Sequence, residues 1–309
     1  MENPFEYNER LYSINTKSSE QKEYSKVFKV EHKEQLPKTL RKYYELNNNN
    51  VDAILNFYLY ASNPDELNDP IDCLVQLFDF DKFSHDKKQF YYKKTEMDLS
   101  TPFEIVFTNY IRKEHFELFG IISLTEWENE NPSLWATYTS KNKGFAVDFE
   151  TEFFKESGNG PFPMEYNFIG SEEISKYKEE CNAHKILFSF YIKHNLFSFE
   201  REWRILAPIG DANKQERINK IKYHKAAIRQ VILGFNFFAR DESFRLNSKS
   251  YKVTLLKTDL RYLLLKHCIS EGIKICQLKV NTQKLEFEAI ELSTEFDYFN
   301  DSITFNFKK

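Results

Sequence analysis

The sequence predicts an α+β fold, with a bent antiparallel or mixed sheet and helices packed at its edges. Its 309 residues, 41% of them apolar, can bury an ordinary core. Residues 119–149 read as strand, short helix and strand, and with only 8 glycines no G-x-G-x-x-G turn follows a strand. We therefore expect a single domain over residues 1–309, which could carry an insert at 151–195 between core strands.

The first part of the chain predicts one helix and one strand. Apolar residues recur at helical spacing over residues 33–46, and the run of asparagines at 47–50 is expected to end this helix. Residues 53–61 are rich in aliphatic and aromatic side chains and predict a strand, which leads into a turn at 63–65. The Asn-Asp-Pro sequence at 68–70 predicts a second turn or a helix start.

The middle of the chain predicts two helices and two strands. Residues 101–116 carry apolar side chains at helical spacing after a Thr-Pro start, which is typical of a capped helix. Residues 119–124 predict a buried strand. A short helix is expected to open with Asn-Pro at 131–132, and the alternation over 144–149 predicts another strand.

The last part begins after a cluster of turn-forming residues at 158–163. The remaining helices are expected at 171–182, 183–195 and 259–271, and the remaining strands at 203–208, 228–234, 273–280 and 285–292. Gly272 directly follows the last of these helices. Because glycine tolerates the positive φ of a helix end, this residue is expected to terminate it.

Composition and short motifs argue against several classes of function. The 43 basic and 47 acidic residues give a formal net charge of −4, so non-specific nucleic-acid binding is not expected. No apolar stretch approaches the roughly 20 residues of a membrane span and the start shows no secretory signal, so we expect a cytoplasmic protein without membrane contact. The 4 cysteines form no C-x-x-C pair and the 7 histidines no H-E-x-x-H, so no metal is expected.

Four short segments carry the informative motifs, foremost the acidic strand entry Glu-Arg-Glu-Trp-Arg at 200–204. The others are Leu-Tyr-Ser at 11–13, a strand with an Asn-Asp-Pro turn at 60–72, and a W-x-x-Y helix followed by Lys-Gly-Phe within 120–149. In this order they resemble a bacterial family catalogued as domain of unknown function 2971, over nearly all of the chain. The name of that family carries no assigned chemistry.

A looser resemblance, to the ADP-ribosyltransferases, implies a chemistry. In those enzymes a strand with a Ser or Thr edge precedes a short helix with an aromatic residue, and a later strand opens with a catalytic Glu, often within E-x-E. Ser123 and Thr125, then Tyr138, then Glu200 and Glu202 follow that order of parts. The resemblance implies an ADP-ribosyltransferase-like core, with NAD as co-substrate.

The resemblance also assigns roles to the residues. Glu202 would be the catalyst, because cleavage of the bond between nicotinamide and ribose passes through an oxocarbenium-like state that a fixed carboxylate stabilises. Glu200, two residues away on the same strand, would share its face and orient the group that accepts ADP-ribose. Arg204 would hold Glu202 or meet a phosphate. Trp135 and Tyr138, three apart on a helix, would form an aromatic wall against a nicotinamide or adenine ring.

The first strand departs from the transferase pattern. Those enzymes bind the nicotinamide nucleotide through an Arg or a His on their first strand. This chain instead has Tyr12 in the strand and Arg10 just before it. Tyr12 is therefore counted among the candidate NAD-binding residues, and either Arg10 takes the gripping role or that residue is missing. The expected function is an NAD-consuming ADP-ribosyltransferase or NAD glycohydrolase, of the kind used as toxins or phage-defence effectors, with an unknown macromolecular acceptor.

Other interpretations remain open. The chain could be a non-catalytic module that binds a nucleotide or a protein through an aromatic cleft, or a metal-dependent nuclease, although no acidic and lysine motif supports the latter. Trp135 and Tyr138 could be core aromatics. Glu202 and Arg204 could form an ordinary ion pair on a solvated strand face. The Asn-Asp-Pro sequence at 68–70 could be a purely structural turn.

Overall fold

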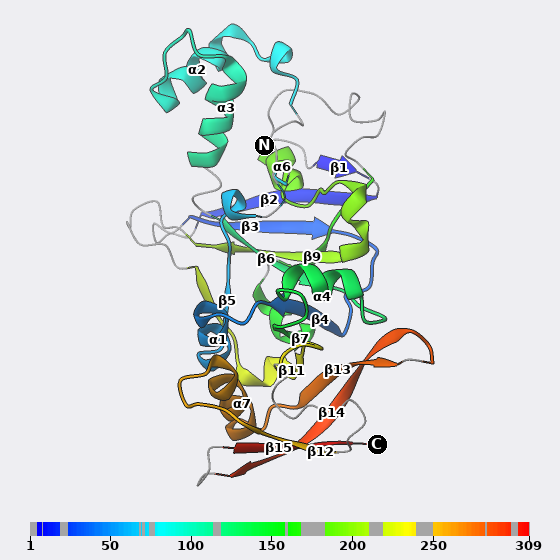
Figure 1. Ribbon diagram of the computed structural model, residues 1–309. Helices are drawn as coiled ribbons and strands as arrows, with labels where there is room; N and C mark the ends of the chain where they lie inside the picture. Colours follow the sequence, from blue (N-terminus) through cyan, green and yellow to red (C-terminus); the bar gives the residue numbers. More distant parts are fainter. Residues whose placement is uncertain are drawn as a thin grey trace. The chain divides into compact units, whose positions relative to one another are not determined.

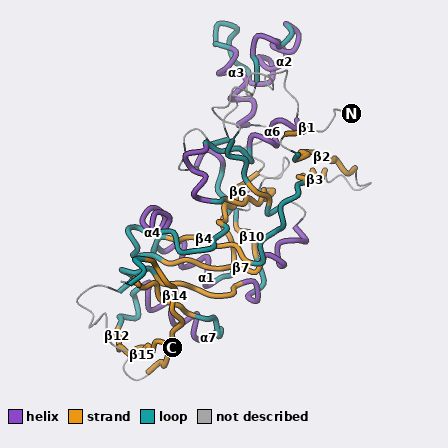
Figure 2. The backbone as a smooth tube through the Cα atoms, turned by 90° about the vertical axis from the view of Figure 1, so that its right-hand side faces the viewer, coloured by secondary structure: helices purple, strands orange, loops and turns teal. Residues whose placement is uncertain are grey.

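The computed structural model describes residues 5–7, 9–18, 24–67, 69, 72–73, 78–113, 119–157, 160–167, 183–209, 219–238, 250–281, 283–297 and 302–308. The chain divides into two compact units. Unit 1 comprises Met1–Leu36, Tyr60–Ser123 and Phe154–Ile221, and unit 2 comprises Pro37–Leu59, Leu124–Phe153 and Lys222–Lys309. Both units contain helices and strands (Figure 1; Figure 2).

Unit 1 contains a three-stranded antiparallel sheet in the order β1-β2-β3. Its strands are β1 (Phe5–Tyr7), β2 (Arg10–Ser18) and β3 (Tyr24–Glu31). A second group of neighbouring strands has the order β6-β9-β8, namely β6 (Phe119–Thr125), β9 (Glu202–Pro208) and β8 (Phe162–Pro163). The last two residues of β6 belong to unit 2.

The helical elements of unit 1 include a pair of helices and several single turns. They are η1 (Pro64–Glu66), η2 (Phe80–Lys82), α2 (His85–Thr95), α3 (Phe103–Ile111), α6 (Ala183–Ser189) and η5 (Asn195–Glu200). Helix α2 begins where the Ser84 side chain accepts a hydrogen bond from the backbone N–H of Lys87, as an N-cap residue does. Helix α6 packs against β2.

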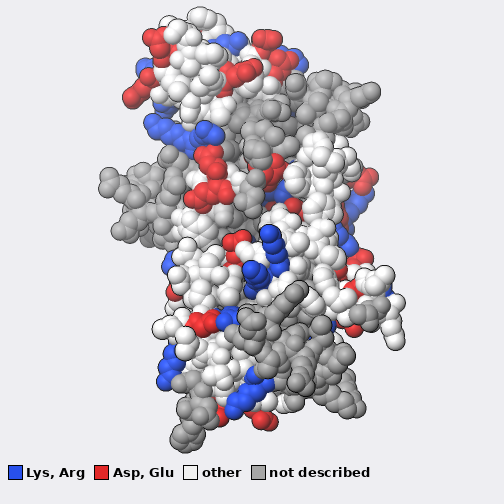
Figure 3. Space-filling model, in the orientation of Figure 1, with Lys and Arg blue, Asp and Glu red and all other residues white. Residues whose placement is uncertain are grey.

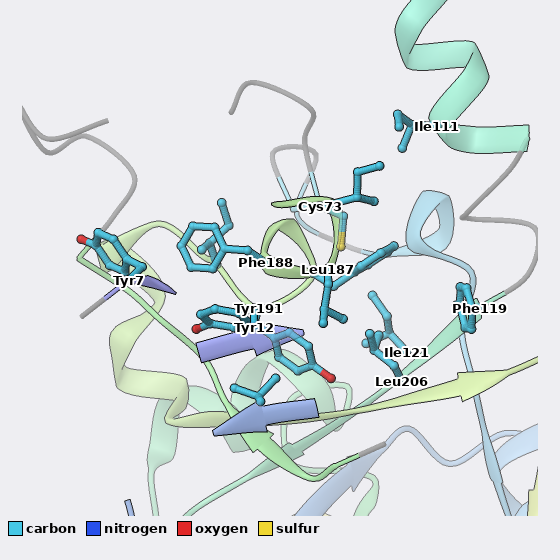
Figure 4. Close-up of a cluster of buried hydrophobic side chains, with 14 of the residues drawn as sticks. Tyr7, Tyr12, Cys73, Ile111, Phe119, Ile121, Leu187, Phe188, Tyr191 and Leu206 are labelled. Atoms are coloured by element: carbon cyan, nitrogen blue, oxygen red, sulfur yellow. The ribbon is translucent and has the colours of Figure 1, made fainter. Parts of the chain in front are cut away.

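The core of unit 1 is rich in aromatic residues. Tyr12 from β2 packs edge to face against Phe188 from α6, with ring centroids 4.8 Å apart, and lies 6.3 Å from the ring of Tyr191 (Figure 4). Leu206 from β9 is fully buried in the same cluster. Burial of each such side chain stabilises the fold by roughly 1.5–3 kcal/mol, so this cluster fixes β2, α6 and β9 relative to one another.

Unit 2 is built on a mixed sheet in the order β12-β15-β14-β13-β11-β7-β4. The strands are β4 (Thr39–Tyr44), β7 (Phe145–Glu150), β11 (Ile228–Leu233), β12 (Ser250–Thr254), β13 (Ile275–Asn281), β14 (Glu286–Asp297) and β15 (Ser302–Phe307). The pair β11 and β13 is parallel and the other pairs in this order are antiparallel. The two parallel strands are joined by a long connection that includes α7 (Leu260–Ser270), as parallel pairing requires.

The other elements of unit 2 are short. They are α1 (Asn48–Leu55), α4 (Pro132–Tyr138) and η6 (Lys225–Ala227). The element η4 (Thr151–Ser157) begins in unit 2 and ends in unit 1. The strands β5 (Tyr58–Tyr60) and β10 (Lys220–Lys222), each of which has residues in both units, form a separate two-stranded sheet. Gly144, just before β7, lies where a Cβ atom would be 2.0 Å from the carbonyl oxygen of Tyr44, so only glycine allows β4 and β7 to approach as they do.

The structure confirms the mixed α and β class with a large mixed sheet. It also confirms elements close to the expected ranges: the strands β6, β7, β9, β11, β13 and β14 and the helices α3, α4 and α7. Gly272 has a φ of +69°, as expected of a residue that ends a helix. Among the residues that the structure describes, no helix combines the length and apolar character needed to cross a membrane.

Three expected elements are wrong. The helix at 33–46 is the strand β4, and the strand at 53–61 is mostly the end of α1, with strand only at β5. The side chain of Asn47 accepts a hydrogen bond from Asn50 N, so the asparagine run begins a helix rather than ending one. The helix at 183–195 ends at Ser189. The expected helix at 171–182, and parts of the turns at 68–70 and 158–163, lie outside the described residues.

Candidate functional site

The acidic segment that leads into β9 spans two elements. Glu200 is the last residue of η5, and Glu202 is the first residue of β9. Between them Arg201 has a left-handed conformation with a φ of 44°, so the expectation that Glu200 and Glu202 lie on one strand is wrong. Both carboxylates nevertheless reach the same group, because this turn brings Glu200 back toward Lys193.

Lys193 joins the two carboxylates. Its Nζ donates hydrogen bonds to Oε2 of Glu200 at 2.6 Å and to Oε2 of Glu202 at 3.0 Å. The ring of Phe197 lies with its centroid 5.2 Å from the same Nζ, a cation–π contact. All three charged side chains are buried.

Arg204 lies on the same face of β9 as Glu202 and binds it from the other side. Its Nε donates to Glu202 Oε1 at 2.7 Å, and its Nη1 donates to Asp72 Oδ1 and to the carbonyl oxygen of Phe190, both at 2.8 Å. Nη2 donates to the second oxygens of Asp72 and Glu202. The ion pair of Glu202 and Arg204 is therefore present, but the Arg204 side chain is 1% exposed, so the expectation of a solvated strand face is wrong.

We call the group Asp72, Lys193, Glu200, Glu202 and Arg204 the unit 1 charge cluster. It holds three carboxylates and two cations, which gives a formal charge of −1. Buried ions cost several kcal/mol each in lost hydration, and good hydrogen-bond geometry is needed to offset that cost. A cluster of this kind is therefore weak evidence for stability, and its charged groups are candidates for a chemical role.

Glu202 is held in its ionised form. Burial by itself raises the pKa of this carboxyl, but the charges of Arg204 and Lys193, with hydrogen bonds from Arg204 and Ser123, outweigh burial and lower the pKa to about 2. The backbone N–H of Glu202 donates to the hydroxyl of Tyr166 at 2.7 Å. At neutral pH Glu202 is thus a fixed anion in a protein-lined environment.

The other candidate residues of unit 1 have different partners, and only Ser123 is shown bonded to Glu202 among those described. Ser123, on the neighbouring strand β6, hydrogen-bonds to Glu202. Tyr12 is fully buried among the aromatic core residues. Arg10 donates to Glu34 from Nε at 3.0 Å and lies 3.6 Å from a carboxylate oxygen of Glu165.

The remaining candidates, Thr125, Trp135 and Tyr138, belong to unit 2. Thr125 pairs with Arg41 in the β4–β6 ladder. Trp135 is fully buried, and its Nε1 donates to Glu130 Oε2 at 2.8 Å. Tyr138 is partly buried. In this structure Trp135 has the contacts of a core aromatic, and the aromatic wall stays a prediction.

Unit 2 has a buried charged group of its own. Arg41 donates from Nε and Nη2 to the two oxygens of Asp148, at 2.6 and 3.0 Å, and from Nη1 to Glu130 at 2.6 Å. Its guanidinium lies 4.1 Å from the ring centroid of Trp127, and Gln230 donates to Asp148 at 2.7 Å. Arg41 and Asp148 face each other across β4 and β7, so this group ties the two strands together.

No family model, curated protein or solved structure matches this chain. The resemblances to domain of unknown function 2971 and to the ADP-ribosyltransferases therefore stay predictions.

Two members of the unit 1 charge cluster were not among the predicted site residues. Lys193 lies seven and nine positions before the two glutamates, and no helix or strand period at this spacing indicates the contact. Asp72 lies 132 positions from its partner Arg204, and no local pattern indicates such a pairing. Within the described part of the chain no group of three or more His, Cys, Asp or Glu residues is arranged to hold a metal ion. Basic and acidic side chains are interspersed on the face drawn in Figure 3.

Proposed function

We propose that this protein is an NAD-consuming ADP-ribosyltransferase or NAD glycohydrolase in which Glu202 is the catalytic carboxylate. The observation that carries the proposal is the ionised, doubly paired state of Glu202, between Arg204 and Lys193. A carboxylate that stabilises a developing positive charge must be ionised and fixed before the reaction begins. Glu202 meets both conditions at neutral pH.

The chemistry follows from that charge. The bond between the ribose carbon and the nicotinamide nitrogen breaks, its electron pair leaves with neutral nicotinamide, and positive charge develops on the ribose. Glu202 faces that charge. Water or an acceptor group then forms the new bond to the same carbon and loses a proton, for which the nearby carboxylate of Glu200 is an acceptor.

The cluster's charge supports a cationic substrate. Its formal charge of −1 attracts the positively charged nicotinamide ring of oxidised NAD, and a buried environment strengthens that attraction. Glu202 is only 4% exposed, so substrate entry requires movement of the segments that cover it. The alternative of a binding module with an aromatic cleft has less support, because Trp135 is fully buried.

The test is release of nicotinamide from NAD by the purified full chain, with and without cell extract as a source of acceptor. Glu202→Gln keeps the shape of the side chain and removes its charge, so it should lower the rate at least about 100-fold while the protein stays folded. Glu104→Gln, at an exposed position in the first turn of α3, is the matched control and should retain the full rate. Absence of release by the unmodified protein in both conditions, or a fully active folded Glu202→Gln, would refute the proposal.

A further inference from the structure

Lys193 occupies a backbone position that is held from two sides. Its N–H donates to the carbonyl oxygen of Glu165 at 2.9 Å, and the N–H of Glu165 donates to the carbonyl oxygen of Tyr191 at 2.7 Å. This pairing lies directly before η5, which carries Glu200. The start of the Lys193 side chain is thereby fixed, and its Nζ ends between two carboxylates.

We infer that Lys193 is the positioning residue of this site: its ammonium group draws the carboxylates of Glu200 and Glu202 together and keeps both available in the active arrangement. The claim that Lys193 supports catalysis rests on the proposed function. The claim that Lys193 holds the two carboxylates together does not. Lys193 acts through the two glutamates and has no role in bond breaking.

The backbone turn places the two carboxylates near each other but does not offset their repulsion. Glu200 ends a 3-10 helix and Glu202 begins a strand, with the left-handed Arg201 between them. Two carboxylates at close range repel each other, and a shared cation offsets that repulsion. Arg204 is unable to replace Lys193, because its guanidinium already binds both oxygens of Asp72 and both oxygens of Glu202.

The groups that face Glu202 come from several elements. The titratable or charged ones are Lys193, Glu200, Arg204 and Tyr166, with Asp72 and Cys73 beyond Arg204. Burial lowers the pKa of Lys193, but the charges of Glu202 and Glu200 and the hydrogen bond to Glu200 outweigh it, so the pKa is raised and the ammonium stays protonated at neutral pH. Without it, Glu202 loses one of the two cations that favour its ionised form.

The variants Lys193→Met, Lys193→Gln and Lys193→Arg separate charge from packing. For each we would measure kcat and KM for nicotinamide release from pH 4 to pH 8. Lys193→Met and Lys193→Gln should lower kcat at least about tenfold with KM changed less than about threefold, and should move the acid limb of the profile up by about one pH unit or more. Lys193→Arg keeps the cation and should restore most of kcat and the original acid limb.

A matched control and a second measurement complete the test. Lys225→Met removes an exposed lysine that is 3.1 Å from Glu271, and it should leave the profile unchanged. The pH dependence of urea unfolding is recorded for the same proteins, with no NAD present. Removal of the Lys193 charge should move the acid loss of stability to higher pH, and Lys193→Arg should not.

The outcomes distinguish this inference from the proposed function. If the unmodified protein releases no nicotinamide, the proposed function fails, and the unfolding measurement alone decides the geometric role of Lys193. Coincident pH dependence of unfolding for Lys193→Gln and the unmodified protein overturns the inference. The inference is also overturned if kcat falls equally in Lys193→Gln and Lys193→Arg and the acid limb of the pH profile does not move. That result would mean that the packing of the side chain matters and its charge does not. Should Lys193→Met fail to fold, the comparison of Gln with Arg remains decisive.

Discussion

Replacement of Arg41 by methionine should strongly destabilise unit 2. The side chains of Arg41 and Asp148 are 0% exposed and that of Glu130 is 5% exposed. Methionine keeps much of the length and apolar contact of the arginine side chain but carries no charge. The change therefore leaves two buried carboxylates without their cation.

The magnitude follows from the contacts that are lost and retained. Asp148 loses donors at 2.6 and 3.0 Å and keeps Gln230 at 2.7 Å, while Glu130 loses a donor at 2.6 Å and keeps Trp135 at 2.8 Å. Removal of one partner from a buried ion pair typically costs about 3–5 kcal/mol. We expect a loss in this range in the free energy of unfolding, which is a large part of the stability of an ordinary domain.

Urea denaturation followed by tryptophan fluorescence measures this loss. The chain has 3 tryptophans, and a Trp203→Phe background leaves Trp127 and Trp135, which both lie beside the Arg41 group in unit 2. The control Arg229→Met removes a half-exposed arginine 3.7 Å from Glu150 and should cost at most about 1 kcal/mol.

A double variant tests the cause of the loss. In Arg41→Met combined with Asp148→Asn, one of the two buried carboxylates that lost their cation is also removed. The double variant should therefore recover part of the stability lost in the single variant. If Arg41→Met costs no more than the exposed control, the reasoning about buried charge in unit 2 is refuted.

The two remaining predictions concern pH and close packing. Because the pKa of Glu202 in the folded protein is about 2, against an ordinary 4.5, its ionisation stabilises the fold above pH 4.5 and that contribution is lost as the pH falls to 2. Between pH 5 and pH 2 the unmodified protein should therefore lose roughly 3 kcal/mol more stability than Glu202→Gln in urea titrations, and equal losses would contradict this. Gly144→Ala should lower the free energy of unfolding by at least about 2 kcal/mol, because the new Cβ would lie 2.0 Å from the Tyr44 carbonyl oxygen. Gly272→Ala, at a φ of +69° with nothing within 4 Å, should lower it by only about 1–2 kcal/mol. Thermal or urea unfolding measures both losses, and the reverse order would contradict the packing argument.

Elements decided by local sequence were predictable. Helix α7 has its N-cap at Asp259, whose side chain accepts from Arg261 N, and Gly272 follows its end with a positive φ. These signals act over a few residues and need no tertiary contact. Strand β4 differs, because Leu40 and Tyr44 are four residues apart, a spacing that fits one face of a helix as well as one face of a strand. Its pairing with β7, about a hundred residues later in the chain, decides in favour of the strand.

In the candidate site, too, the features that depend on local sequence were predictable and those that depend on tertiary contacts were not. Glu202 and Arg204 are two apart on a regular strand, and their shared face is confirmed. The position of Glu200 was wrong because nothing in the local pattern indicates the left-handed Arg201. Asp72 could not be assigned as the partner of Arg204, since two residues 132 positions apart are brought together only by the tertiary fold.

The division of the chain into two units has a consequence for its synthesis. The chain passes from one unit to the other five times, so neither unit is a continuous segment that could be cut out and expressed alone. All segments of unit 1 have been made once Ile221 is added, whereas unit 2 still needs Lys222–Lys309. At ordinary translation rates that remainder takes on the order of ten seconds. For much of this interval β11 lacks its later partner β13, and an unpaired strand edge of this kind is a template for pairing with another chain.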